Sequence, residues 1–140
     1  MLKYNFILYL VSPFILLKLI FYSIRNSVKF SNLKYKLFGQ KLSSSYSVWL
    51  HAASVGEMKI ALRVTKSLID RGFKGILITS NTPSSKLIFD EAKLDNVDHY
   101  YLPFDFFFAT KKFVKSISAE LLIIIETEIW PNLYHHCQVN

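Results

Sequence analysis

An uninterrupted apolar run at residues 121–125, Leu-Leu-Ile-Ile-Ile, limits most strongly what this chain can fold into. A strand without polar alternation is typical of a parallel sheet whose two faces are both covered by helices. Three strand-like segments precede it, at residues 48–52, 75–80 and 97–102. Because a helical pattern lies between each strand and the next, the sequence predicts a parallel, doubly wound α/β sheet.

The connecting helices are predicted from apolar spacing and from capping residues. The first spans about 58–71 and ends at Gly72, and the second begins near Pro83. Asp105 is expected to cap a third helix that runs to about residue 117, and Pro131 can open another. The folded unit is therefore expected at residues 47–140.

The first strand leads into a turn of small residues that ends at Glu57, where a helix begins. In open α/β sheets, ligands bind beyond the carboxyl ends of the strands, so Glu57 is a candidate for chemistry. The helix dipole favours its charged form, which suits a general base, and Gly56 would let a ligand approach the backbone closely. Ser54 and Glu57 also fit the Ser-x-x-Glu capping box, and this purely structural interpretation stays open.

Two further acids, Glu126 and Glu128, follow the strand at 121–125 and are therefore expected on the same edge as Glu57. They could equally be solvated loop acids, or favourable charges near a helix start. His51 is expected to be a hydrogen-bonded core or edge residue. The aromatic residues of the segment 104–108 fit either the core or an exposed apolar patch for a lipid.

The positive charge lies at the N-terminal end of the chain. Residues 1–56 hold seven basic and no acidic side chains, and the ten basic residues that remain are balanced by ten acidic ones. A segment that is both basic and apolar indicates a membrane surface rich in anionic lipids rather than a nucleic acid.

The apolar segment at residues 6–24 has nearly the roughly 20 residues that cross a bilayer. Pro13 and Lys18 interrupt it, so both a tilted span and a helix lying in the interface are expected possibilities. Basic residues that follow the segment predict a cytoplasmic location for the rest of the chain. Residues 1–24 are thus expected to be a membrane anchor and residues 25–46 a basic connector.

Four motifs in this order resemble the N-terminal half of the lipid A Kdo (3-deoxy-D-manno-octulosonic acid) transferases. They are Trp-Leu-His-Ala-Ala-Ser-Val-Gly-Glu at 49–57, Thr-Pro at 82–83, Tyr-Leu-Pro-Phe-Asp at 101–105 and Ile-Glu-Thr-Glu-Ile-Trp-Pro-Asn at 125–132. The resemblance implies a GT-B glycosyltransferase of the bacterial inner membrane, on its cytoplasmic face. This chain would supply the Rossmann-like domain that receives the lipid A precursor in lipopolysaccharide biosynthesis.

By the same resemblance, Glu57 is the proton acceptor and Glu126 stabilises the transition state. Ser54, Gly56, Glu128 and Thr82 are assigned to acceptor binding. The donor substrate would be CMP-Kdo, and the resemblance implies neither a cofactor nor a metal.

The chain departs from the family pattern mainly in length. It lacks the nucleotide-binding half and ends nine residues after Pro131, so we expect a domain that is cut short and has little transfer activity alone. Smaller departures are Ile125 in place of the usual Met, and Ser-Asn-Thr-Pro-Ser-Ser at 80–85 in place of Thr-Met-Thr-Pro-Thr-Gly. Two alternatives stay open: a non-catalytic, membrane-anchored remnant that binds acidic lipid, and a related transferase that uses another sugar nucleotide.

Overall fold

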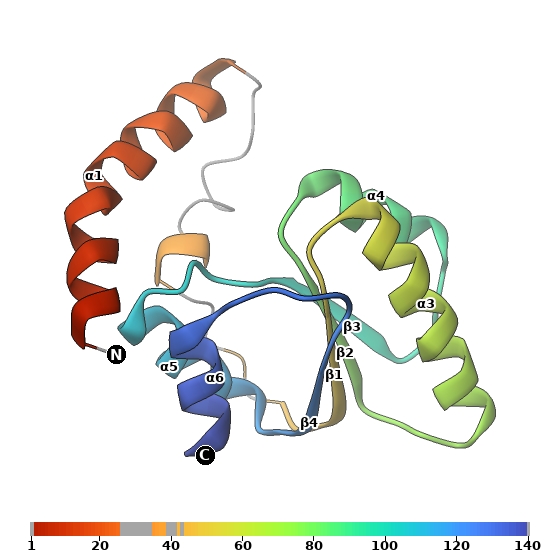
Figure 1. Cartoon of the computed structure of the whole chain (residues 1–140). Coiled ribbons are helices and arrows are strands. Elements are labelled where there is room, and N and C mark those ends of the chain that lie inside the picture. Colours follow the sequence, from red (N-terminus) through yellow and green to blue (C-terminus); the bar gives the residue numbers. More distant parts are fainter. Residues whose placement is uncertain (1, 26–34, 39–41, 43, 140) are drawn as a thin grey trace.

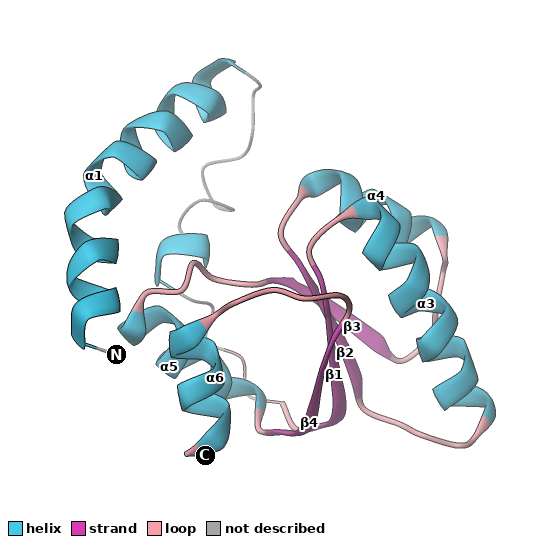
Figure 2. Cartoon of the chain, viewed as in Figure 1, coloured by secondary structure: helices cyan, strands magenta, loops and turns pink. Residues whose placement is uncertain are grey.

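The computed structural model describes residues 2–25, 35–38, 42 and 44–139. In chain order the elements are α1 (Leu2–Arg25), β1 (Tyr46–Ala52), α3 (Val55–Asp70), β2 (Ile76–Ser80), α4 (Pro83–Glu91), β3 (Val97–Tyr101), α5 (Phe107–Ile117), β4 (Ala119–Ile124) and α6 (Pro131–Gln138). Residues 35–38 form one helical turn. Strands and helices alternate from β1 onward, as the sequence predicts (Figure 2).

The strands form one parallel sheet in the order β3-β2-β1-β4. Helices α3 and α4 cover one face, and α5 and α6 cover the other (Figure 1). The doubly wound arrangement is therefore confirmed. Strand β1 lies between β2 and β4, and His51 near its end is opposite Thr79 on β2 and Ile124 on β4.

Alternate residues of β1 enter two different hydrophobic cores, because successive side chains of a strand point to opposite faces. Val48 and Leu50 pack with Met58 of α3. Trp49 packs instead with Phe113 of α5, their ring centroids 5.6 Å apart. Burying a side chain of this size contributes about 1.5–3 kcal/mol, so β1 anchors both layers.

Strand β4 is less buried than its sequence predicts. Leu121 keeps 52 % of its surface, and the residues from Leu122 to Ile124 are only half-buried. The expectation of burial on both faces is wrong because, among the described residues, β4 pairs with β1 alone and is an edge of the sheet.

Asp105 caps a different helix from the one predicted. Helix α5 begins at Phe107, and its N-cap Phe106 makes no side-chain capping bond. The buried carboxylate of Asp105 instead accepts hydrogen bonds from the backbone N–H groups of Asn132 (3.0 Å) and Leu133 (2.9 Å), in the first turn of α6. Desolvation raises the pKa of Asp105, and these hydrogen bonds oppose the shift.

Helix α1 forms as expected and contains Pro13. Its N-terminal end contacts the α5–α6 side of the domain, where Tyr4 donates to Asp105 (2.9 Å) and the Asn132 amide donates to Asn5 (2.7 Å). In the described part of the chain, no helix has both the length and the apolar character to cross a membrane. The spanning alternative for α1 is thus not confirmed.

The expected basic connector lies largely at residues 26–34, 39–41 and 43, outside the described residues. The turn at 35–38 does contact the domain. Phe104 N donates to the Lys36 carbonyl (2.7 Å), and the Lys36 ammonium donates to the carbonyl of Asn81. Burial lowers the pKa of Lys36.

Candidate active site

The capping box at the start of α3 is present. Ser54 is the N-cap, and its hydroxyl oxygen accepts from Glu57 N at 3.2 Å. Glu57 Oε2 accepts in turn from Ala53 N at 2.8 Å. Glu57 keeps 8 % of its surface, and its Oε1 has no hydrogen-bond partner among the described residues. One carboxylate oxygen therefore fixes the turn, and the other makes no hydrogen bond within the described part of the chain.

Gly56 does not use the conformational freedom expected of it. It lies in the first turn of α3 without a positive φ, and an added Cβ would meet only Ser54 Oγ, at 3.8 Å. The backbone conformation and the space around the residue would therefore admit a Cβ.

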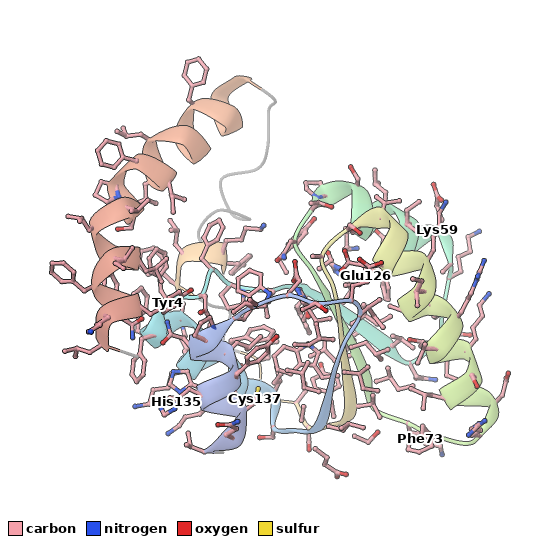
Figure 3. All side chains as sticks on the ribbon, viewed as in Figure 1. Tyr4, Lys59, Phe73, Glu126, His135 and Cys137 are labelled. Carbon is pink, nitrogen blue, oxygen red and sulfur yellow. The ribbon has the colours of Figure 1, made fainter. Side chains whose placement is uncertain are left out.

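The two acids after β4 have different surroundings. Glu126 is exposed, and its φ of 65° places it in the left-handed region. Figure 3 shows it on the bend after β4, at the end of the sheet where α3 begins. Glu128 is partly buried, and its Oε2 accepts from the Trp130 indole at 2.8 Å and lies 3.0 Å from His51 Nε2. The structure brings Glu57 and Glu126 to the same edge of the sheet, at the carboxyl ends of its strands. It connects Glu128 to His51 of β1.

His51 lies fully buried beneath this edge, as a hydrogen-bonded residue of the kind expected. Its Nδ1 is 2.9 Å from the hydroxyl of Thr79, which also accepts from the Trp49 indole at 2.8 Å. Desolvation lowers the pKa of His51, while the carboxylates of Glu128 and Glu57 oppose the shift. Because desolvation penalises the charged form, the neutral imidazole is favoured, and it makes a hydrogen bond with Glu128.

Thr82 is the N-cap of α4, just beyond the end of β2. Its hydroxyl accepts from Ser85 N at 3.2 Å and is hydrogen-bonded to the Ser85 hydroxyl at 2.8 Å. Lys36 reaches the same edge through Asn81, and sequence reasoning missed it because no local pattern indicates which strand end a connector residue will contact. Among the described residues, no group of three or more His, Cys, Asp or Glu side chains could hold a metal ion.

Fold and site together define a Rossmann-like α/β domain with an acid-bearing ligand edge at the carboxyl ends of its strands. The family model of 3-deoxy-D-manno-octulosonic-acid transferase (kdotransferase) matches residues 25–140. The chain belongs to this family of glycosyltransferases.

Curated relatives agree with this assignment. The chain is 38 % identical over 89 residues to a 3-deoxy-D-manno-octulosonic acid transferase of Haemophilus influenzae, covering 63 % of this chain and 21 % of that protein. It is 40 % identical over 105 residues to a Rickettsia felis protein of the same name, covering 71 % and 21 %. A bifunctional glycosyltransferase/methyltransferase of Fusobacterium nucleatum is 30 % identical over 117 residues, with 74 % and 18 % covered. The chain spans about a fifth of the length of these relatives.

Proposed function

We propose that this chain is the acceptor-side domain of an enzyme that transfers Kdo from CMP-Kdo to the lipid A precursor in lipopolysaccharide biosynthesis. Glu57 acts as general base and Glu126 stabilises the transition state. Ser54, Gly56, Glu128 and Thr82 shape the acceptor site, although in this structure Ser54, Glu128 and Thr82 make hydrogen bonds within the protein. CMP-Kdo would be held by residues outside this chain.

In the proposed step, a glucosamine hydroxyl of the acceptor approaches Glu57. Its oxygen forms a bond to the anomeric carbon of Kdo, the bond from that carbon to the CMP phosphate oxygen breaks, and CMP leaves with the electron pair. The hydroxyl proton passes to Oε1 of Glu57, the oxygen that the capping bond leaves unused. Inversion at the anomeric carbon follows from a single displacement.

The observation that carries the proposal is the position of the two acids. β1 and β4 are neighbouring parallel strands in register, with His51 opposite Ile124, so the segments that follow them bring Glu57 and Glu126 to one edge. If Glu57 served only to cap α3, a second acid on the same edge of the sheet would not be required. The family assignment supports the chemistry that we give to the pair.

Glu57→Gln in a full-length transferase that contains this segment tests the base. The amide oxygen of Gln still accepts from Ala53 N, so the cap stays, whereas proton transfer is lost and the rate falls about 10²–10⁴-fold. Glu120→Gln is the matched control, because it makes the same substitution at an exposed acid at the start of β4, at the opposite end of the strand from Glu126, and should keep full transfer. Full transfer by Glu57→Gln, measured from CMP-Kdo to the lipid A precursor, would refute the assignment.

We further propose that α1 lies in the anionic surface of the bacterial inner membrane, on its cytoplasmic side. Six exposed apolar side chains of α1 recur every three or four residues and share one side of the helix: Leu2, Phe6, Leu10, Phe14, Leu17 and Phe21. Ile7, Tyr9 and Val11 are also exposed, so the apolar surface extends beyond this side. Tyr4 and Asn5 contact the domain instead.

Vesicle sedimentation tests this location. Phe14→Asp is expected to weaken binding to anionic vesicles at least about tenfold, since burying one Phe is worth about 1.5–3 kcal/mol. Phe73→Asp is the matched control, because Phe73 is also exposed but lies at the far end of the domain (Figure 3). Equal loss in both variants, or none in either, would contradict the proposal.

A further inference from the structure

His51 holds both ends of the turn that carries Glu126. Its carbonyl oxygen accepts from Ile125 N at 2.9 Å, and its side-chain Nε2 lies 3.0 Å from Glu128 Oε2. Only Glu126 and Thr127 lie between these two contacts. The backbone and the side chain of one residue therefore fix where the turn starts and where it ends.

This turn needs such support. The left-handed conformation of Glu126 is strained for a residue with a Cβ, and strain of this kind persists only where neighbouring groups enforce it. Two further residues, Trp130 just before α6 and Tyr134 within it, support the end of the turn at Glu128. The Trp130 indole donates to Glu128 Oε2, and the Tyr134 hydroxyl donates to the Glu128 carbonyl.

The hydrogen bonds also select the tautomer of His51. An ionised carboxylate only accepts hydrogen bonds, so Nε2 must carry the proton that faces Glu128. Nδ1 of the neutral ring then accepts, and the Thr79 hydroxyl, whose oxygen accepts from the Trp49 indole, can donate its proton to Nδ1. The other acceptor near that hydroxyl, the Leu50 carbonyl, is more distant at 3.5 Å. His51 and Thr79 are both fully buried, so water cannot replace either contact.

We propose that His51 is a positioning residue for Glu126: its ring, held by Thr79 in the Nε2–H tautomer, fixes Glu128 and so keeps the left-handed turn at Glu126 on the Glu57 edge. The proposed function is assumed only for the role of Glu126 in transfer. The geometric claim about the turn can be tested on the chain as it stands.

The first experiment uses ¹⁵N NMR on residues 1–140. The wild-type His51 ring is expected to show a protonated Nε2 and an unprotonated Nδ1 at pH 7. The Gln of His51→Gln can place an amide N–H near the position of Nε2, whereas the shorter Asn of His51→Asn reaches only about as far as Nδ1. Amide exchange at Ile125, whose N–H donates to the His51 carbonyl, should quicken about tenfold in His51→Asn, as expected for a turn that has lost one hydrogen bond, and less than threefold in His51→Gln.

An Nδ1–H tautomer in the wild type would overturn the proposal, and so would equal amide exchange at Ile125 in the two variants. If a His51 variant fails to fold, Thr79→Val and Thr79→Ser form a second pair. Only Thr79→Val removes the donor to Nδ1, so only this variant should raise the exchange rate in the turn. The wild-type tautomer is measured without any substitution.

The second experiment measures transfer by a full-length enzyme that contains this segment. His51→Asn should lower kcat about tenfold or more with the KM for the acceptor changed less than threefold, and His51→Gln should recover part of kcat. An unchanged kcat in His51→Asn would overturn the proposal. If the wild type transfers no Kdo, the proposed function fails, and the NMR result alone decides the geometric claim.

Discussion

The stability of this domain should fall in mild acid because of His99. His99 lies on β3, with Nε2 2.8 Å from the Ser80 hydroxyl and its ring 5.0 Å from the ring of Phe89 on α4. Burial and the nearby charge of Lys86 lower the pKa of His99 from 6.5 to about 4, and Asp90 only partly opposes them. The folded protein therefore binds a proton at this site less readily than the unfolded chain.

The sign and the size follow from this difference. Below pH 6.5 the unfolded state binds more protons than the folded state, so the free energy of unfolding decreases as the pH falls towards 4. Each pKa unit corresponds to about 1.4 kcal/mol, so the loss is about 2 kcal/mol at pH 5 and about 3 kcal/mol below pH 4. These are upper values, because the side chain is only partly shielded from solvent.

Urea unfolding of the wild type and His99→Gln between pH 7.5 and 5 measures the effect. Burial also lowers the pKa of His51 and His136, so the wild-type curve contains more than one contribution and the difference between the two proteins isolates His99. The Gln side chain can still hydrogen-bond to Ser80. Between pH 7.5 and 5, we expect the free energy of unfolding of His99→Gln to fall by about 2 kcal/mol less than that of the wild type. Parallel curves for the two proteins would refute the reasoning.

Three further predictions concern single contacts, each measured by urea unfolding. Asp105→Asn should cost about 2–3 kcal/mol, because it leaves one buried N–H of α6 unpaired, whereas Asp95→Asn in the exposed loop before β3 should change stability by less than about 0.5 kcal/mol. Glu126→Gly should be more stable than Glu126→Ala by about 1 kcal/mol, since only glycine adopts a φ of 65° without strain, and equal stability would contradict a left-handed turn there. Thr82→Ala should cost about 1 kcal/mol through the lost cap of α4 and Thr82→Ser much less, and equal losses would exclude the cap.

Local patterns in the sequence were enough to predict the elements that depend on local hydrogen bonds. The strand and helix alternation was correct, and the Ser54–Glu57 spacing correctly indicated a capping box. The position of Glu126 on the edge of Glu57 was also predictable, since parallel strands place their carboxyl ends together.

The errors concern partners that are distant in the chain. Asp105 precedes one helix but caps another, 27 and 28 residues further on, and no spacing rule distinguishes the two. Leu121 resembles a fully buried residue, but its exposure depends on which strand lies at the edge of the sheet. Glu128 was predicted from its place beside Glu126, yet its contact with His51, 77 residues away, exists only once the sheet has formed.

The attachment of α1 has a consequence for the order of events during synthesis. Tyr4 is separated from Asp105 by 101 positions and Asn5 from Asn132 by 127, so neither pair can form until the segment that holds the second residue has left the ribosome. At roughly 5–20 residues per second, translation alone imposes a delay on the order of 5–25 s. Throughout that interval the nascent helix is without these two hydrogen-bond partners.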